Sequence, residues 1–147
     1  MMKERFNIKQ NVPKGYRSLL ELDKAINETG IEPALLYLMY IRISQMNGCA
    51  FCTDMHWKDA RKAGLTEEKL SRVPCWRESP GFSDRECAAL DWAEAVTDLH
   101  PAHVSDGAYG AARANFSEAE ISGLTLAIAA MNLWNRLGIA CRMVPGE

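Results

Sequence analysis

The sequence predicts an all-helical protein, a compact bundle of about six or seven helices. The β-branched, alternating runs that are typical of strands are missing, and glycine and proline fall at the edges of segments. Helix-start signals recur instead. Ser83–Glu86 and Ser117–Glu120 both fit the capping box, in which a hydroxyl and a carboxylate satisfy free backbone donors. In each, a hydrophobic residue before the cap matches one four positions after it, which is typical of a hydrophobic staple.

The remaining helix boundaries follow from punctuation along the chain. Gly30 and Gly64 lie where C-terminal caps belong, Pro33 opens a segment, and Thr66 has a hydrophobic staple. The stretch 73–82 contains two prolines and a glycine and is expected to be irregular. In the last helix, apolar residues recur at helical spacing along one stripe: Ile121, Leu124, Ile128 and Met131. The expected helices, in chain order, are 16–29, 33–47, 49–63, 66–72, 83–99, 104–114 and 117–138.

Length and charge narrow the class of protein. The 147 residues are enough for one compact domain, so a single domain over 1–147 is expected. The net charge is −2 with the signs interspersed, which argues against nucleic-acid and anionic-membrane partners, since both require a concentrated basic face. The longest purely apolar run, 34–41, is far shorter than the roughly 20 residues of a membrane span. The first ten residues lack the apolar core of a secretory signal, and we expect a cytoplasmic protein.

Helix 33–47 is apolar nearly all round, and Arg42 is its only charge. A helix that is hydrophobic on every side is buried on every side, so either subunit contacts surround it or it is central to a small bundle. Arg42 is expected to be paired, because a buried cation seldom stays without a partner. It could bind an anionic substrate or a carboxylate across a subunit contact, and a structural role is the favoured interpretation.

The five cysteines fall into two groups. Cys75, Cys87 and Cys141 stand alone among apolar neighbours and are expected to be buried as small hydrophobes. Cys49 and Cys52 differ, because the helix stop at 47–48 places the first at the entrance of the next helix and the second in its first turn.

The start of a helix favours a thiolate over a thiol, because free backbone N–H groups and the positive end of the helix dipole lie there. A Cys-x-x-Cys pair in that position can close a small disulfide and reopen it, which is typical of a redox site. His56 follows Cys52 by four residues and therefore shares its helix face. Its imidazole can take the thiol proton or pair with the thiolate.

The same residues allow other interpretations. Zinc could be held by the cysteine pair and His56, but the fourth ligand would have to come from elsewhere, His100 and His103 being the only other histidines. These two lie in a polar linker and are expected to be solvated. A c-type haem requires a histidine directly after the second cysteine, where Thr53 stands. The pair could also be unreactive core thiols beside a surface His56. No metal or cofactor is expected.

The motif Asn-Gly-Cys-x-x-Cys-x-x-x-His at 47–56, preceded by an apolar helix and followed by Ala63-Gly64, resembles the alkylhydroperoxidase D core. That family belongs to the larger carboxymuconolactone decarboxylase-like group. The segment 126–137, which contains Asn132, Trp134 and Asn135, is also similar to a branch of it. The resemblance covers residues from about 31 to 145.

The resemblance implies a thiol-dependent peroxidase. Cys52 would be the peroxidatic cysteine, whose thiolate attacks the O–O bond of an organic hydroperoxide, releases the alcohol and is left as a sulfenic acid. Cys49 would be the resolving cysteine that closes the disulfide, and His56 the proton carrier. An external dithiol, on a lipoylated or thioredoxin-like protein, would reduce the pair again. The family also implies an all-α fold and a homo-oligomer, either trimer or hexamer.

Two positions depart from the family pattern. Tyr37 stands where the family has a glutamate, the outer member of a Glu–His–Cys proton relay. In a helical hairpin Tyr37 would lie near His56, but a phenol that titrates near 10 cannot supply a negative charge at neutral pH. Phe51 stands where well-known peroxidases of the family have a second histidine. Both changes predict a slower peroxidase or a different substrate.

Two alternative functions stay open. One is a decarboxylase or lactone-handling enzyme of the wider group, against which the cysteine pair argues, because those members generally work without one. The other is non-enzymatic, a zinc-stabilised or redox-sensing helical module that binds a partner. A plain structural oligomer would predict that Cys52→Ser changes nothing except stability.

Overall fold

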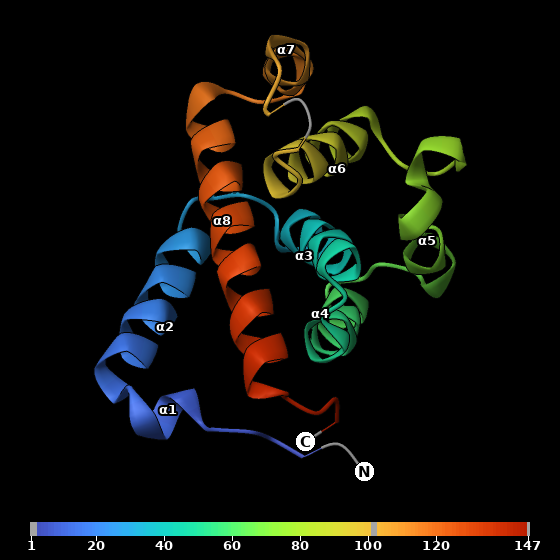
Figure 1. Cartoon of the computed structure of the whole chain (residues 1–147). Coiled ribbons are helices and arrows are strands. Elements are labelled where there is room, and N and C mark those ends of the chain that lie inside the picture. Colours follow the sequence, from blue (N-terminus) through green and yellow to red (C-terminus); the bar gives the residue numbers. More distant parts are fainter. Residues whose placement is uncertain (1–2, 101–102, 147) are drawn as a thin grey trace.

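The computed structural model describes residues 3–100 and 103–146, and over these ranges the chain is built from helices without a strand (Figure 1). This confirms the predicted all-α class. The elements are, in chain order, α1 (Ile8–Asn11), α2 (Pro13–Asn27), α3 (Pro33–Asn47), α4 (Ala50–Lys62), α5 (Glu67–Ser71), the 3-10 helix η1 (Val73–Glu78), α6 (Asp84–Thr97), α7 (Asp106–Asn115) and α8 (Glu118–Cys141).

The seven predicted helices correspond to α2 through α8, and both predicted capping boxes are present. The prediction omits α1, a single turn that Asn7 caps by accepting a hydrogen bond from the backbone N–H of Gln10. It is also wrong about part of 73–82, where η1 forms because a proline fits the first turn of a helix. α8 continues past residue 138 and ends where Arg142 adopts a left-handed conformation at φ +59°.

α3 is the central helix of the bundle. It packs against α4, α6, α8 and η1, and side chains on all its sides are buried, among them Leu36, Leu38, Ile41 and Ile43. Helices of the same chain therefore enclose α3. This accounts for its all-round apolar character without a second subunit.

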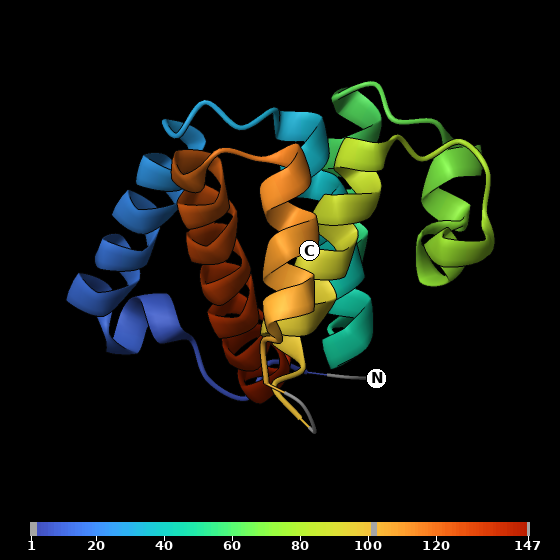
Figure 2. The same ribbon diagram turned by 90° about the horizontal axis from the view of Figure 1, so that it is seen from above.

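Two hydrophobic clusters lie on either side of α3. The larger joins residues of α2, α3, α4, α6, α7 and α8, and the smaller joins residues of α3, α4, α5, η1 and α6. α7 packs on the outer side of α6 and α8, as the view from above shows (Figure 2). The predicted stripe of α8, from Ile121 to Met131, faces the larger cluster.

α8 is the one helix in the described part of the chain that is long and apolar enough to cross a membrane by those two criteria. The length of the longest uninterrupted apolar run did not reveal this helix, because serine, threonine, asparagine and glycine interrupt its apolar residues without making the helix polar overall. In the bundle it contacts α2, α3, α4, α6 and α7, and ten of its residues are buried. The buried apolar residues of α8 are therefore used in packing against the rest of the chain.

The helical hairpin of α3 and α4 positions the cysteine pair. α3 ends at Gly48, which has φ +70°, a left-handed conformation that glycine adopts without strain. The backbone N–H of Cys49 donates to the Ser44 carbonyl at 2.9 Å and closes the turn. The predicted Asn-Gly stop is confirmed, and the turn brings Cys49 directly to the start of α4.

The three isolated cysteines differ in burial. Cys141 is buried as expected, and Cys87 is half-buried. The expectation is wrong for Cys75, which is exposed. In η1 the neighbouring Val73 and Trp76 face the core, and Cys75 between them points outward. Neighbours in sequence therefore did not indicate its surroundings.

Candidate active site

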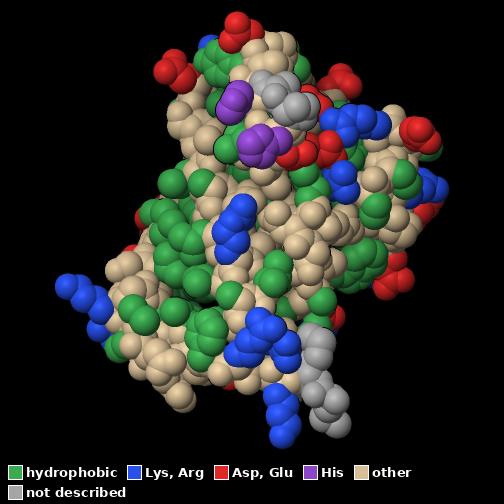
Figure 3. Space-filling model, viewed as in Figure 1, with side chains coloured by type: hydrophobic (Ala, Val, Ile, Leu, Met, Phe, Trp, Pro, Cys, Tyr) green, Lys and Arg blue, Asp and Glu red, His purple; other side chains and the backbone are tan. Residues whose placement is uncertain are grey.

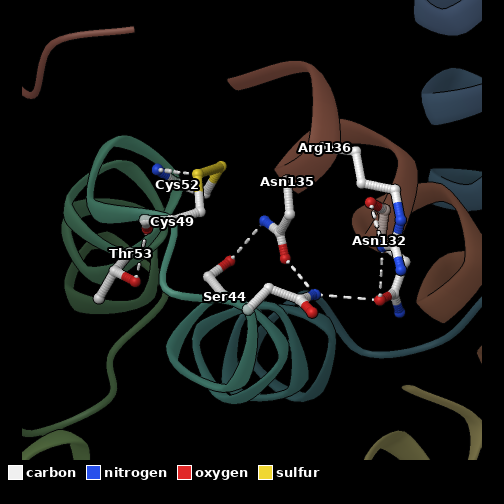
Figure 4. Close-up of a disulfide and its surroundings, with 8 residues drawn as sticks. Ser44, Cys49, Cys52, Thr53, Asn132, Asn135 and Arg136 are labelled. Atoms are coloured by element: carbon white, nitrogen blue, oxygen red, sulfur yellow. Dashed lines mark hydrogen bonds between the residues drawn. A yellow bond between two sulfur atoms is a disulfide. The ribbon is translucent and has the colours of Figure 1, made fainter. Parts of the chain in front are cut away.

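Cys49 and Cys52 are joined by a disulfide at the N-terminus of α4 (Figure 4). Cys49 is the N-cap residue, and its sulfur accepts a hydrogen bond from the backbone N–H of Cys52 at 3.3 Å. Both residues are about 2% exposed. The structure thus places the pair at the helix mouth, as predicted, and brings the two sulfurs within bonding distance. Backbone donors at this position stabilise negative charge on a sulfur when the bond opens.

α8 packs directly against the disulfide. A Cβ atom at Gly138 would lie 3.3 Å from the sulfur of Cys49 and 3.4 Å from that of Cys52. Contacts this short are tighter than ordinary for a Cβ atom, so a larger residue would require the neighbours to shift, and the sulfur of Met143 would lie 3.8 Å from the same Cβ. Access to the two sulfurs is therefore blocked on the α8 side.

A buried network of amides fixes the turn that carries Cys49 (Figure 4). Asn135 of α8 is fully buried and donates to the hydroxyl of Ser44 at 3.1 Å. Asn47 donates to the side-chain oxygens of Asn135 at 2.9 Å and Asn132 at 3.0 Å. The network ties the end of α3 to α8. The two asparagines of the similar segment 126–137 thus have a structural task here, to hold the loop before the cysteines.

His56 lies one turn after Cys52 and is 8% exposed, which excludes the interpretation of a surface histidine. Its ring is tilted against that of Tyr40, with the centroids 4.9 Å apart, and is stacked 6.2 Å from that of Tyr37. Nδ1 has no hydrogen-bond partner and lies 4.0 Å from the Asp59 carboxylate. Burial lowers the pKa of His56 to about 4, against the opposing effect of Asp59. The imidazole is therefore neutral near pH 7 and can accept a proton.

A cavity of about 300 Å³ opens beside the cysteine pair. Cys52 and His56 line it, whereas Cys49 instead lines a separate, open groove with Ser44 and Trp57. The two cysteines of the disulfide thus border different spaces. A molecule in the cavity meets Cys52.

Both positions that depart from the family pattern line this cavity. Tyr37 stands beside His56, as the hairpin argument predicted, and Phe51 adds an apolar ring next to Cys52. The described hydrogen bonds include none between Tyr37 and His56. Tyr37 therefore contributes ring contact rather than a carboxylate-like acceptor.

Sequence reasoning missed the far wall of the cavity, which α2 provides through Tyr16, Leu20 and Asp23. It also missed Tyr40, although that residue follows Tyr37 by three positions and so shares its helix face. Spacing could have found Tyr40. The α2 residues lie far from the motif in sequence, and no local pattern joins them to it.

Arg42 is not among the residues of the cavity. Its guanidinium pairs with Glu94 of α6 at 2.6 Å, and Glu94 also accepts from Trp76 Nε1 at 2.8 Å and pairs with Arg77. Burial alone would raise the pKa of Glu94, but these three partners together hold it below its ordinary value. The carboxylate expected for Arg42 is thus supplied within the chain.

No cluster of three or more His, Cys, Asp or Glu side chains that could hold a metal occurs in 3–100 or 103–146. His100 and His103, the other candidate zinc ligands, are exposed in the linker between α6 and α7. Cysteines joined in a disulfide have no thiolate to offer to zinc.

Comparison with known proteins gives the family. Residues 13–95, which include α2, α3, α4 and most of α6, match the model of the carboxymuconolactone decarboxylase family. The chain belongs to this family. A relative from Bacillus subtilis, the uncharacterized protein YdfG, is 37% identical over 139 residues, which are 95% of either chain.

Solved structures of the family agree in fold. ATU0492 from Agrobacterium tumefaciens, a protein of unknown function with a proposed role as the antioxidant defence protein AhpD, superposes with a TM-score of 0.95 at 36% identity over 99% of both chains. An alkylhydroperoxidase AhpD core from Ralstonia eutropha JMP134, an uncharacterized peroxidase-related protein, reaches 0.83 at 19% identity, over 95% of this chain and 74% of that one. The second likeness concerns the fold alone. Family membership and the Cys-x-x-Cys pair are consistent with a peroxidase.

Proposed function

We propose that the protein is a thiol-dependent peroxidase that reduces organic hydroperoxides through Cys52, Cys49 and His56. The observation that carries this proposal is that Cys52, and not Cys49, lines the apolar cavity together with a buried histidine. A hydroperoxide in the cavity meets one sulfur and one proton acceptor. The other sulfur is already in position to close a disulfide.

The catalytic cycle balances in three steps. Neutral His56 takes the thiol proton of Cys52, whose thiolate attacks the terminal oxygen of the hydroperoxide, and the O–O bond breaks. The alcohol leaves with the proton from His56, and Cys52 becomes a sulfenic acid. The Cys49 thiol then condenses with it, which releases water and forms the disulfide. An external dithiol reduces the disulfide by two exchange steps and becomes a disulfide itself.

The neutral imidazole of His56 supports the role of proton carrier. Burial lowers its pKa to about 4, so a ring nitrogen is free to accept the thiol proton at pH 7, but the ring is a weak base because its pKa lies below the pH at which it works. The helix N-terminus supplies the stabilisation of the thiolate. Neither the imidazole nor the helix N-terminus requires a carboxylate at Tyr37.

The proposal includes the partners that the resemblance implied. The reductant is a dithiol on a lipoylated or thioredoxin-like protein, in a reducing cytoplasm that regenerates it. A homo-oligomer, trimer or hexamer, is supported by the exposed apolar side chains of Leu126, Leu133 and Ile139 along α8. Hydrophobic side chains also gather in patches on the face of the molecule that Figure 3 shows. Light scattering on the purified protein tests the oligomer, and a monomeric mass would contradict it.

The test of the peroxidase function is a single turnover. The reduced protein is mixed with one equivalent of cumene hydroperoxide, and the thiols are mapped by peptide mass spectrometry. We expect the wild type to form the Cys49–Cys52 disulfide and one equivalent of cumyl alcohol. Cys49→Ser should instead trap a sulfenic acid on Cys52, which dimedone labels. Cys75→Ser, which changes an exposed thiol outside the cavity, is the matched control and should behave as the wild type. Unchanged thiols in the wild type would reject the proposal.

A further inference from the structure

The far wall of the cavity carries one acidic side chain. Asp23 of α2 is half-buried, and its Oδ1 accepts a hydrogen bond from the indole Nε1 of Trp134 at 3.0 Å. Its other oxygen, Oδ2, forms no hydrogen bond or ion pair with the residues that the structure describes. One acceptor of the carboxylate is thus committed to Trp134, and the other remains available to a molecule in the cavity.

Nothing cationic in the cavity wall balances this carboxylate. The lining residues include neither lysine nor arginine, and His56 is neutral near pH 7. Burial raises the pKa of Asp23 and the Trp134 hydrogen bond opposes the rise, so the ionised form lacks the support that an ion pair would give. A carboxylate in such surroundings favours a ligand that brings its own positive charge, and it repels one that is negative.

Aromatic side chains surround the same space. Tyr16 contacts Trp134 edge to face, with the ring centroids 5.8 Å apart, and Tyr37 and Tyr40 contact each other at 6.4 Å. All four rings line the cavity. Aromatic rings attract cations through their electron-rich faces, and a carboxylate beside them adds a direct partner for an ammonium. Charge and aromatic character therefore point to the same kind of ligand group.

We propose that the cavity selects apolar hydroperoxides that carry an ammonium group, and that Asp23 is the residue that recognises this group. The inference rests on the proposed function, since it names the substrate class of that same site. The peroxide end lies at Cys52 of α4 and the ammonium end at Asp23 of α2. A volume of about 300 Å³ suits a molecule of one aromatic ring with short substituents. Hydroperoxides that bear a carboxylate are excluded.

Binding to the disulfide form tests the selection without any thiol chemistry. The probes are the alcohol 2-phenyl-2-propanol and its para-aminomethyl, para-hydroxymethyl and para-carboxylate derivatives, titrated by calorimetry at pH 7. We expect the aminomethyl compound to bind at least about tenfold more tightly than the parent, the ratio that one charge-assisted hydrogen bond supplies. The hydroxymethyl compound should resemble the parent, and the carboxylate should bind more weakly than either.

Variants of α2 separate recognition from folding. Asp23→Asn keeps an oxygen acceptor for Trp134 and removes the charge, so it should reduce the preference for the aminomethyl compound to less than about threefold. Glu21→Gln removes an exposed carboxylate of the same helix outside the cavity and should change nothing. Circular dichroism verifies that each variant is folded.

Several results would overturn the selection of an ammonium group. In the wild type, one such result is equal affinity for the parent and the aminomethyl compound. Another is a hydroxymethyl compound that binds as tightly as the aminomethyl one. A third is no binding of the aminomethyl compound at millimolar concentration. An unchanged preference in Asp23→Asn would overturn the role of Asp23. Turnover of cumene hydroperoxide without the binding preference rejects this inference alone, whereas the preference without thiol oxidation rejects the peroxidase alone.

Discussion

Replacing Asn135 by alanine should lower the free energy of unfolding by about 3 kcal/mol. The side chain is fully buried, donates to Ser44 at 3.1 Å and accepts from Asn47 at 2.9 Å. Each lost hydrogen bond costs about 0.5–1.5 kcal/mol. The Ser44 hydroxyl is also fully buried, and leaving it without this donor adds about 1–3 kcal/mol. The loss is large because the network lies where α8 meets the turn before Cys49.

Urea unfolding of the oxidised protein, followed by far-ultraviolet circular dichroism, measures this loss. Asn115→Ala is the matched control, because its side chain bonds only to the carbonyl of Ala111 within its own helix, and it should change stability by less than about 0.5 kcal/mol. A double-mutant cycle of Asn135→Ala with Ser44→Ala should give a coupling energy of about 1 kcal/mol. A loss below about 1 kcal/mol for Asn135→Ala, or additive effects in the cycle, would refute the reasoning.

Three further predictions concern pH, close packing and the Arg42 ion pair. The free energy of unfolding should rise with pH between about 4 and 6.5, because His56 binds a proton more readily in the unfolded chain than in the folded one. His56→Gln should remove this part of the slope. Parallel pH profiles of the wild type and the variant would contradict the prediction. Gly138→Ala should lower the free energy of unfolding by about 1 kcal/mol, because the new Cβ would contact both sulfurs. Gly110→Ala in α7, where nothing lies within 4 Å of the new Cβ, should raise it by about 0.5–1 kcal/mol. Urea midpoints that shift in the same direction for both variants would contradict this prediction. Glu94→Gln should lower the free energy of unfolding by about 2 kcal/mol at pH 7. The difference from the wild type should shrink as the pH falls below the ordinary carboxyl pKa of 4.5, because the pKa of Glu94 is lowered in the folded state. A difference that does not depend on pH would contradict a stabilising role of the ion pairs of Glu94.

Local signals in the sequence predicted the helices and the reactive turn. Ser83 and Ser117 begin helices because their hydroxyls and the glutamates three residues later satisfy backbone donors, which depends on adjacent residues alone. The Asn-Gly stop works in the same way, since Gly48 adopts the left-handed conformation that ends α3. Hence the position of Cys49 and Cys52 at a helix mouth, and of His56 one turn on, could be predicted.

Features that depend on distant contacts could not be predicted. Asp23 and Trp134 are 111 residues apart and meet only because α2 packs on α8. Gly138 has an ordinary place inside a helix pattern, and only the approach of α8 to the sulfurs shows why a side chain would be tightly packed there. The prediction that Cys75 is buried is wrong for a related reason, because its neighbours in sequence do not indicate which side of η1 faces the core.

The central claim is that Cys52 is the sulfur that attacks. The most direct measurement is the rate constant for sulfenic acid formation with cumene hydroperoxide, by stopped-flow and dimedone trapping, in Cys49→Ser and in Cys52→Ser, each in a Cys75→Ser background. We predict that Cys49→Ser, which keeps the sulfur at the cavity, reacts at least about tenfold faster than Cys52→Ser, and that adding His56→Gln removes the advantage. Equal rates, or a faster reaction at Cys49, would contradict the account.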